Sequence, residues 1–172
     1  TGNGSTQNIS GLGFQPDFVW IKNRDSSSSH FLHDVVRGFS NGNARELRSN
    51  GTNTEGVPST ANTGLTSFNS DGFSLGSDGG TNANNDAFVA WCWKAGGAPT
   101  TLTAGSVDAQ VSVNTEYGFS IITATQPGTS NLGCTVAHGL GSAPAWYIVK
   151  DRDLGVGWGV YHSGLSNAAS NA

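Results

Sequence analysis

The chain has 172 residues, of which only 12% are charged, and its formal net charge is −4. This acidic balance argues against an electrostatic hold on nucleic acid or on an anionic membrane surface. The longest apolar run, residues 87–93, is far shorter than the ~20 residues of a membrane-spanning helix, so no membrane insertion is predicted. Five Trp, eight Phe and three Tyr must be buried or used in contacts, which argues against a disordered chain.

Apolar runs of strand length recur along the chain, and turn dipeptides separate them. In chain order, the predicted strands are residues 17–21, 30–36, 87–93, 117–122 and 145–149. The intervening turns contain Gly and Asn, which tolerate the positive φ of tight turns. This alternation predicts antiparallel sheet for most of the chain.

Residues 43–51 are the one stretch that favours a helix. Asn43 could cap it, Glu46 follows three residues later, and Gly51 could end it. The rest of the pattern predicts an all-β fold, an antiparallel β-sandwich that is lectin-like or jelly-roll-like in broad architecture. Residues 98–104 follow the strongest strand and are predicted to link a first unit, residues 1–97, to a second unit, residues 105–172.

A fifteen-residue segment occurs twice, at residues 11–25 and 139–153, with a constant shift of 128 and seven identical positions. The identities include Pro16/Pro144 and Lys22/Lys150, so they extend beyond shared glycines. A period this long indicates a duplicated domain rather than a solenoid. The second unit is therefore predicted to be a partial copy of the first, with equivalent strands at residues 17–23 and 145–151.

The duplication also predicts that each copy lacks a part of the other. The strand at residues 117–125 precedes the second copy, and its counterpart would lie before Thr1. The second copy ends before anything that matches residues 71–93. We expect either a trimmed longer polypeptide or a neighbouring subunit to supply the missing strand and to cover the first unit near Phe18 and Trp20. A head-to-tail contact of this kind closes a ring or continues as a filament.

The sequence Gly38-Phe39-Ser40-Asn41-Gly42 fits the Gly-x-Ser-x-Gly pattern of a nucleophile elbow. That pattern is meaningful only at a strand-to-helix turn in an alternating βα chain, and this sequence has no such alternation. The match is interpreted as accidental. The sequence predicts no catalytic residue, and the protein is not expected to be an enzyme.

Three other groups could bind a metal or form a crosslink. His30 and His33 would point to opposite faces of a strand, so they cannot easily share an ion. The Asp- and Asn-rich residues 71–86 could hold Ca²⁺, but their spacing fits no calcium loop, and turns explain them as well. Cys92 and Cys134 could form a disulfide, although Cys92 in an apolar strand more simply acts as a small hydrophobe. No metal and no cofactor are predicted.

The ends of the two repeated strands carry the candidate ligand-binding residues. Each end offers cationic donors and a carboxylate beside aromatic rings, an arrangement that can stack a sugar ring and bond its hydroxyl groups. The alternative is a solvated strand end, where an exposed ion pair contributes at most ~1 kcal/mol. The candidates are Lys22, Arg24, Asp25, Lys150, Arg152, Asp153 and Trp158.

Four motifs in the first unit, at residues 13–24, 34–38, 71–76 and 90–94, together resemble a repeat domain of tailed-phage virion proteins. This repeat is common in marine phages, in proteins described as tail fibres or structural proteins. Residues 118–121, 138–141 and 150–165 resemble the start of the next copy. The resemblance covers nearly the whole chain.

The resemblance implies a virion context and no particular mechanism. The expected function is a non-enzymatic phage structural protein, a tail fibre or other appendage on the surface of the extracellular particle. Its expected partners are other copies of itself or other virion proteins, together with a host surface glycan during attachment. The alternative, from another class, is a carbohydrate-binding module of a larger depolymerase or adhesin.

Overall fold

A computed structural model describes residues 1–126 and 133–165 of the chain. The first unit contains nine strands and a short helix: β1 (Gln7–Ser10), β2 (Phe18–Asn23), β3 (Phe31–Asp34), β4 (Phe39–Ser40), β5 (Asn43–Ala44), β6 (Leu47–Arg48), β7 (Leu65–Asn69), β8 (Gly72–Leu75), α1 (Gly79–Asn82) and β9 (Phe88–Trp93). The second unit contains β10 (Thr100–Leu102), β11 (Ala109–Asn114), β12 (Phe119–Ala124), β13 (Trp146–Lys150) and β14 (Trp158–His162). No helix in the described part of the chain is long and apolar enough to cross a membrane.

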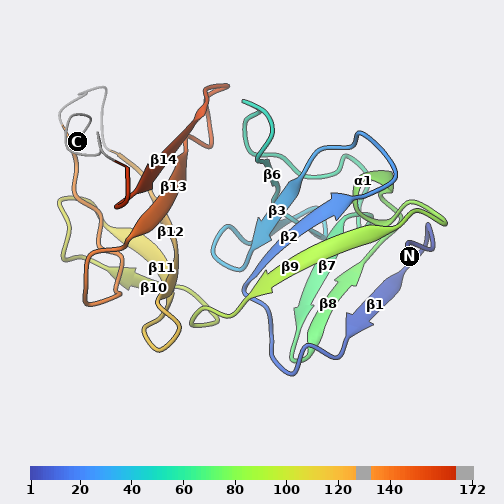
Figure 1. Ribbon diagram of the computed structural model, residues 1–172, viewed down its shortest axis with the longest axis horizontal. Coiled ribbons are helices and arrows are strands. Elements are labelled where there is room, and N and C mark those ends of the chain that lie inside the picture. The colour runs from blue at the N-terminus through green and yellow to red at the C-terminus, as the bar shows by residue number, and fades with distance from the viewer. Residues whose placement is uncertain (127–132, 166–172) are drawn as a thin grey trace.

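The first unit is a sandwich of two antiparallel sheets, with strand orders β6-β3-β2-β9 and β1-β8-β7 (Figure 1). The alternation in β2 explains its place, because Val19 and Ile21 point into the core at 0% and 1% exposure while Trp20 points outward and is half-buried. The core between the sheets is formed by Val19, Ile21, Ala44, Leu65, Phe73 and Leu75. The predicted all-β sandwich is confirmed.

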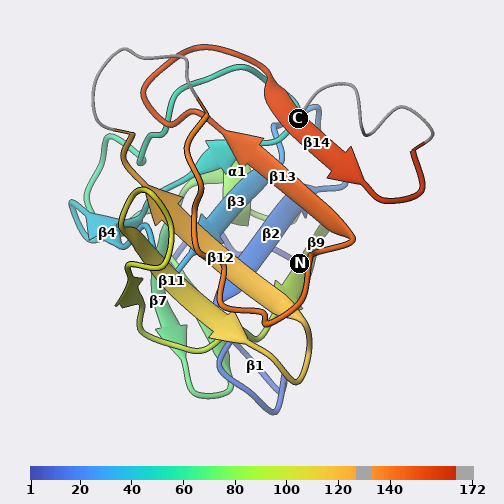
Figure 2. The same cartoon turned by 90° about the vertical axis from the view of Figure 1, so that its left-hand side faces the viewer.

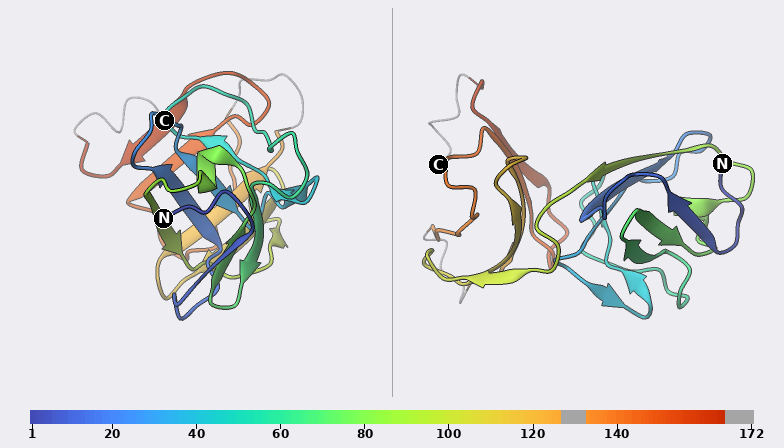
Figure 3. Two further views of the ribbon diagram at one scale, coloured as in Figure 1. Left: turned by 90° about the vertical axis from the view of Figure 1, so that its right-hand side faces the viewer. Right: turned by 90° about the horizontal axis from the view of Figure 1, so that it is seen from below.

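The second unit holds a three-stranded sheet, β10-β11-β12, and a separate hairpin, β13-β14. Figure 2 shows the hairpin and β12 in front of the first unit, and Figure 3 shows that the two units lie at opposite ends of the molecule. Residues 98–104, expected to be a linker, include β10, which pairs with β11. The connection between the units is thus shorter and more ordered than expected.

The repeat is present in the strand register as well as in the sequence. In the first unit Val19 pairs with His33, and in the second Tyr147 pairs with Tyr161, so both partners are shifted by 128. The turns before the strands also match, since Gly11 and Gly13 have positive φ, as do residues 139 and 141. The two segments therefore both form strands with the same pairing register, and that their backbones superpose stays a prediction.

The helix expected at residues 43–51 is wrong, because this segment forms β5 and β6. Asn43 is fully buried and does not cap a helix. Its side-chain amide donates to Thr60 O at 2.9 Å, and its side-chain oxygen accepts from Gly64 N at 2.7 Å. The actual helix begins after Asp78, whose carboxylate accepts from Gly80 N at 2.8 Å as an N-cap.

Candidate functional site

The loop after each repeated strand is held by its own lysine. Lys22 Nζ donates to the backbone oxygen of the next residue and, at 2.9 Å, to Ser26 O. Lys150 makes the same two bonds, and its second bond reaches Leu154 O at 2.8 Å. Two of the three ammonium donors are therefore used inside each loop. Both lysines act as loop anchors.

The first side chain of each loop adds a second set of matched bonds. Asn23 Oδ1 accepts from the backbone N–H of Asp25 at 2.9 Å, and Asp151 Oδ1 accepts from that of Asp153 at 2.9 Å. Backbone N–H groups, first that of Asp153 and then that of Leu154, lower the pKa of the Asp151 carboxyl below its ordinary value. Asp25 is further tied to the start of β9, because its carboxylate accepts from Ala87 N at 2.6 Å.

The two arginines of these loops occupy equivalent positions but have different partners. Arg24 is exposed, and its guanidinium makes no hydrogen bond or ion pair with any described residue. Arg152 Nε and Nη2 donate to the two carboxylate oxygens of Glu55 at 2.9 and 2.7 Å. In addition, Glu55 N donates to Arg152 O at 2.8 Å. This bidentate, charge-assisted contact joins the second unit to the first.

The bond to Glu55 changes the acid–base behaviour of Arg152. It is the main cause that raises the pKa of the guanidinium above its ordinary value, against a smaller opposing effect of partial burial. The negative charge of Asp153 contributes in the same direction as Glu55. Arg152 therefore stays charged, as an arginine does throughout the ordinary pH range.

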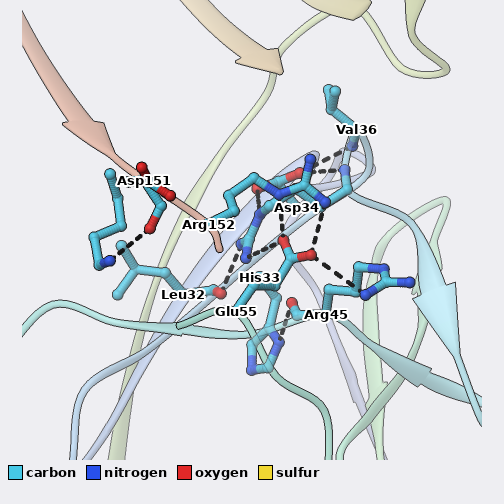
Figure 4. A network of polar contacts seen from close by, with 10 residues as sticks. Leu32, His33, Asp34, Val36, Arg45, Glu55, Asp151 and Arg152 are labelled. Atoms are coloured by element: carbon cyan, nitrogen blue, oxygen red, sulfur yellow. Dashed lines mark hydrogen bonds and ion pairs between the residues drawn. The ribbon is translucent and has the colours of Figure 1, made fainter. Parts of the chain in front are cut away.

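Glu55 also pairs with arginines of the first unit. Its carboxylate lies 3.3 Å from Arg45 Nη1 and 3.6 Å from Arg37 Nη1, and Figure 4 shows Glu55 between Arg45 and Arg152. Arg37 is almost fully buried and is paired a second time with Asp34, at 2.5 Å. We call this group of Glu55 with its three arginines the Glu55 junction.

His33 lies beneath the Glu55 junction and is completely buried (Figure 4). Its Nδ1 is 3.2 Å from Arg45 O, and its Nε2 has no hydrogen-bond partner among the described residues. Burial first, and then the positive charge of Arg37, lowers the pKa of the ring to about 4. His33 is therefore neutral at pH 7.

Trp158 forms a second contact between the units. Its indole Nε1–H donates to Arg48 O at 3.2 Å and to Gly51 O at 3.0 Å. Glu55 follows a few residues later in the same loop of the first unit. The β13-β14 hairpin thus binds one loop of the first unit through the side chains of Arg152 and Trp158.

The polypeptide that joins the units is fixed from both sides. Asp17 Oδ2 accepts from Ala95 N at 2.8 Å and from Gly97 N at 3.1 Å. Ser112 Oγ accepts from Gly96 N at 2.9 Å and donates to Gly97 O at 2.7 Å. The connection therefore holds the two units in a defined relation.

Aromatic rings cover part of the outer face of the first unit. Phe119 of β12 stacks on Trp93 with ring centres 6.1 Å apart and meets Phe18 edge-on at 6.1 Å. Trp20 meets Trp91 edge-on at 5.7 Å, and Trp91 remains 44% exposed. The second unit of the same chain thus covers Phe18. That an assembly covers the region around Trp20 stays a prediction.

The remaining candidate groups have structural partners. Ser40 is the last residue of β4 and pairs with Asn43 of β5, so it does not lie at a strand-to-helix turn. His30 Nδ1 accepts from Trp20 Nε1 at 2.9 Å, and the rings of His30 and His33 have separate partners. Cys92 packs against the core, and both cysteines are free. The described residues contain no group of three or more His, Cys, Asp or Glu side chains placed to hold a metal ion.

The Asp- and Asn-rich residues 71–86 are used for turns. Asp71 accepts from Gly11 N at 3.0 Å and from Gly13 N at 2.5 Å, and these bonds lower the pKa of its carboxyl. Asn82 is buried, and its amide donates to Gly76 O at 2.7 Å. These contacts explain the residue types without a calcium ion.

The sequence-predicted candidates therefore do not form one ligand site. Arg152 and Trp158 reach the first unit, whereas the two lysines secure their own loops. Asp25 ties its loop to the start of β9. Sequence reasoning missed Glu55 and Asp17, which hold the units together. The repetition of the arginine at positions 24 and 152 was the one sequence signal for this contact, and it did not indicate that Glu55 is the partner.

The comparisons with known proteins place the chain in a family. Residues 1–172 match a family described as a domain of unknown function, DUF7483. The chain belongs to this family. No curated protein and no solved structure matches the DUF7483 chain. The family match covers both units and the Glu55 junction between them.

Proposed function

We propose that this DUF7483 protein is a non-enzymatic structural protein of a phage virion, whose units join end to end in a tail fibre or other surface appendage that contributes to host attachment. The observation that carries the proposal is the docking of the second unit through Arg152 onto Glu55 of the first. The virion context is supported by the resemblance of the sequence motifs to a phage repeat domain.

If each unit docks onto the unit before it in the way that Arg152 docks onto Glu55, then Arg24 of the first unit also has a carboxylate partner. A preceding unit would present its own Glu55-type carboxylate to Arg24, just as the first unit presents Glu55 to Arg152. Arg24 is exposed and unpaired among the described residues, as this arrangement requires. A contact that repeats in one direction continues as a filament unless its rotation closes a ring.

A tandem protein tests this relation. Residues 1–128 are placed ahead of the complete chain, which preserves the shift of 128 between units. We expect a double-mutant cycle between Glu55 of the added copy and Arg24 of the following copy to give a coupling energy of about 1 kcal/mol. Lys94 is an exposed lysine directly after β9. It is the matched control and should give no coupling energy with Glu55. Equal values for Arg24 and Lys94 would refute the tandem relation.

The location is tested on intact particles. Antibodies against the chain, combined with electron microscopy of purified virions, should label tail fibres or another appendage. Label that is confined to infected-cell contents and absent from purified virions would contradict the proposal, whatever the tandem experiment shows.

The second candidate is a carbohydrate-binding module of a larger depolymerase or adhesin. The observation that favours it is a set of exposed rings: Trp91 is 44% exposed, and Tyr147 is 46% exposed and stacks on Tyr161 at 4.8 Å. Such faces can stack sugar rings. Binding to a glycan array that Trp91→Ala abolishes and Phe39→Ala preserves would favour this function, since Phe39 is equally exposed.

A further inference from the structure

The two sheets of the first unit leave a groove of about 260 Å³ between β1 and β9. Its lining is mainly apolar and includes Ile9, Leu12, Ile21, Phe88, Ala90 and Cys92. Two polar atoms at the groove, Gln7 Oε1 and Thr81 Oγ1, are buried without a hydrogen-bond partner among the described residues. The apolar side chains of the groove therefore have no apolar group packed over them, and two of its polar atoms have no hydrogen-bond partner among the described residues.

The strands on either side of the groove have unpaired edges. Within the described residues, β1 pairs only with β8, and β9 pairs only with β2. Arg24 N donates to Ala87 O just beyond β9. Because antiparallel pairing alternates, Ala90 and Cys92 then direct their backbone groups away from β2. An unpaired edge beside an apolar groove is a site for an added strand.

The second unit indicates what kind of strand fits. At the shift of 128, His138 is the counterpart of Ser10, the last residue of β1. Ser120 of β12 donates through its Oγ to His138 O at 2.7 Å, so β12 contacts the segment that corresponds to β1. Ile121 is buried at 9% exposure while its neighbour Ile122 is exposed, which gives β12 one apolar face. In the first unit, Ser10 lies in the sequence between Ile9 and Leu12, which both line the groove.

We propose that the groove binds an extended, alternating apolar strand of the β12 type, which pairs with the free edge of β9 and covers Cys92. The partner is thus a polypeptide strand with aromatic or β-branched residues at every second position, as in residues 117–125. This site is separate from the Glu55 junction and does not depend on the proposed virion function. The added strand completes the sandwich of the first unit and supplies polar partners along its edge.

A graft tests the proposal. Residues 117–128 are placed directly before Thr1 of the full chain, which reproduces the spacing between β12 and the second copy. We expect the melting temperature to rise by about 5 °C or more, as 1–2 kcal/mol would give in a domain of this size. Alkylation of Cys92 should slow at least about tenfold relative to exposed Cys134, because covering the edge blocks local access.

The matched control is the same graft with Phe119→Asp and Ile121→Asp in the grafted copy only. It has the same length but no apolar face, so neither the melting temperature nor the Cys92 rate should change. A free peptide of residues 116–125, added to the unmodified chain, provides a second test in which the N-terminus of the chain is not altered. It should protect Cys92, and its two-aspartate version should not.

Three results would overturn the proposal. The first is that neither graft nor peptide protects Cys92, or that the aspartate versions protect it equally well. The second is a concentration-dependent dimer of the unmodified chain that itself protects Cys92, since the groove would then be an interface between copies. The third is protection by dodecyl maltoside but not by the peptide, which would make the groove a site for small apolar ligands.

Discussion

Acidification should destabilise the protein through His33. In the unfolded chain this ring has the ordinary histidine pKa of 6.5, and in the folded chain burial lowers the pKa to about 4. As the pH falls below 6.5, the unfolded state takes up a proton that the folded state does not accept. The free energy of unfolding therefore falls by about 1.4 kcal/mol per pH unit between pH 6.5 and 4, about 3 kcal/mol in all. Below pH 4 this contribution falls no further.

The surroundings of the ring explain the size of the effect. Nδ1 lies against Arg45 O, while Nε2 has no partner among the described residues. Protonation would place a buried N–H without an acceptor near the positive charge of Arg37, and the nearby Asp34 carboxylate compensates only in part. A loss of about 3 kcal/mol is large against the ~5–15 kcal/mol that hold a typical domain folded.

Urea unfolding followed by tryptophan fluorescence, at several pH values from 4 to 7, measures the slope. The comparison is His33→Asn, whose side-chain amide can take the place of Nδ1–H. Glu46, whose pKa is raised by burial, opposes the effect in the native protein, and His30, whose pKa is lowered by burial, adds to it. Both remain in the variant, so the difference in slope isolates His33. Equal slopes in the two proteins would refute the reasoning.

Three further predictions concern the junction, the thiols and Ser40. Glu55→Gln should lower the free energy of unfolding by about 3 kcal/mol, because it also removes one of the two carboxylate partners of buried Arg37. Arg152→Ala should lower it by about 1 kcal/mol, and equal losses in urea titrations would contradict this. Burial raises the pKa of Cys92 to about 11, so Ellman's reagent should react at least ten times faster with exposed Cys134, and similar rates would contradict the packing. A fluorophosphonate probe should leave Ser40 unlabelled, and stoichiometric labelling would show a nucleophile.

Local patterns were sufficient to predict the repeated strands. The apolar run at residues 17–21 predicted β2, and the repeat around Pro144 predicted β13 at the equivalent position. The register of the two hairpins is the same because the strands and the loops between them have the same spacing in both copies. Period, turn residues and strand length all act over short distances, so the sequence reveals them directly.

Long-range partners were not predictable in this way. Asn43 has the residue type of a helix cap, but its amide bonds to Thr60 O and its oxygen to Gly64 N, about twenty residues away. Glu55 lies in a loop with no pattern around it, and one of its partners, Arg152, is 97 positions away. Arg24 and Arg152 occupy equivalent positions in the repeat, each two residues after a lysine and directly before an aspartate, yet only Arg152 has a carboxylate of another unit as its partner.

The order of the second hairpin depends on the first unit more than on its own core. Tyr147 and Val149 are 46% and 59% exposed, whereas their counterparts Val19 and Ile21 are 0% and 1% exposed. A two-stranded hairpin is marginally stable by itself in water, and this one lacks a facing sheet among the described residues. Its fixed position therefore rests on Arg152 and the indole of β14, which bind one loop of the first unit. Loss of that contact should release the hairpin before the first sandwich unfolds, because the sandwich keeps its own core.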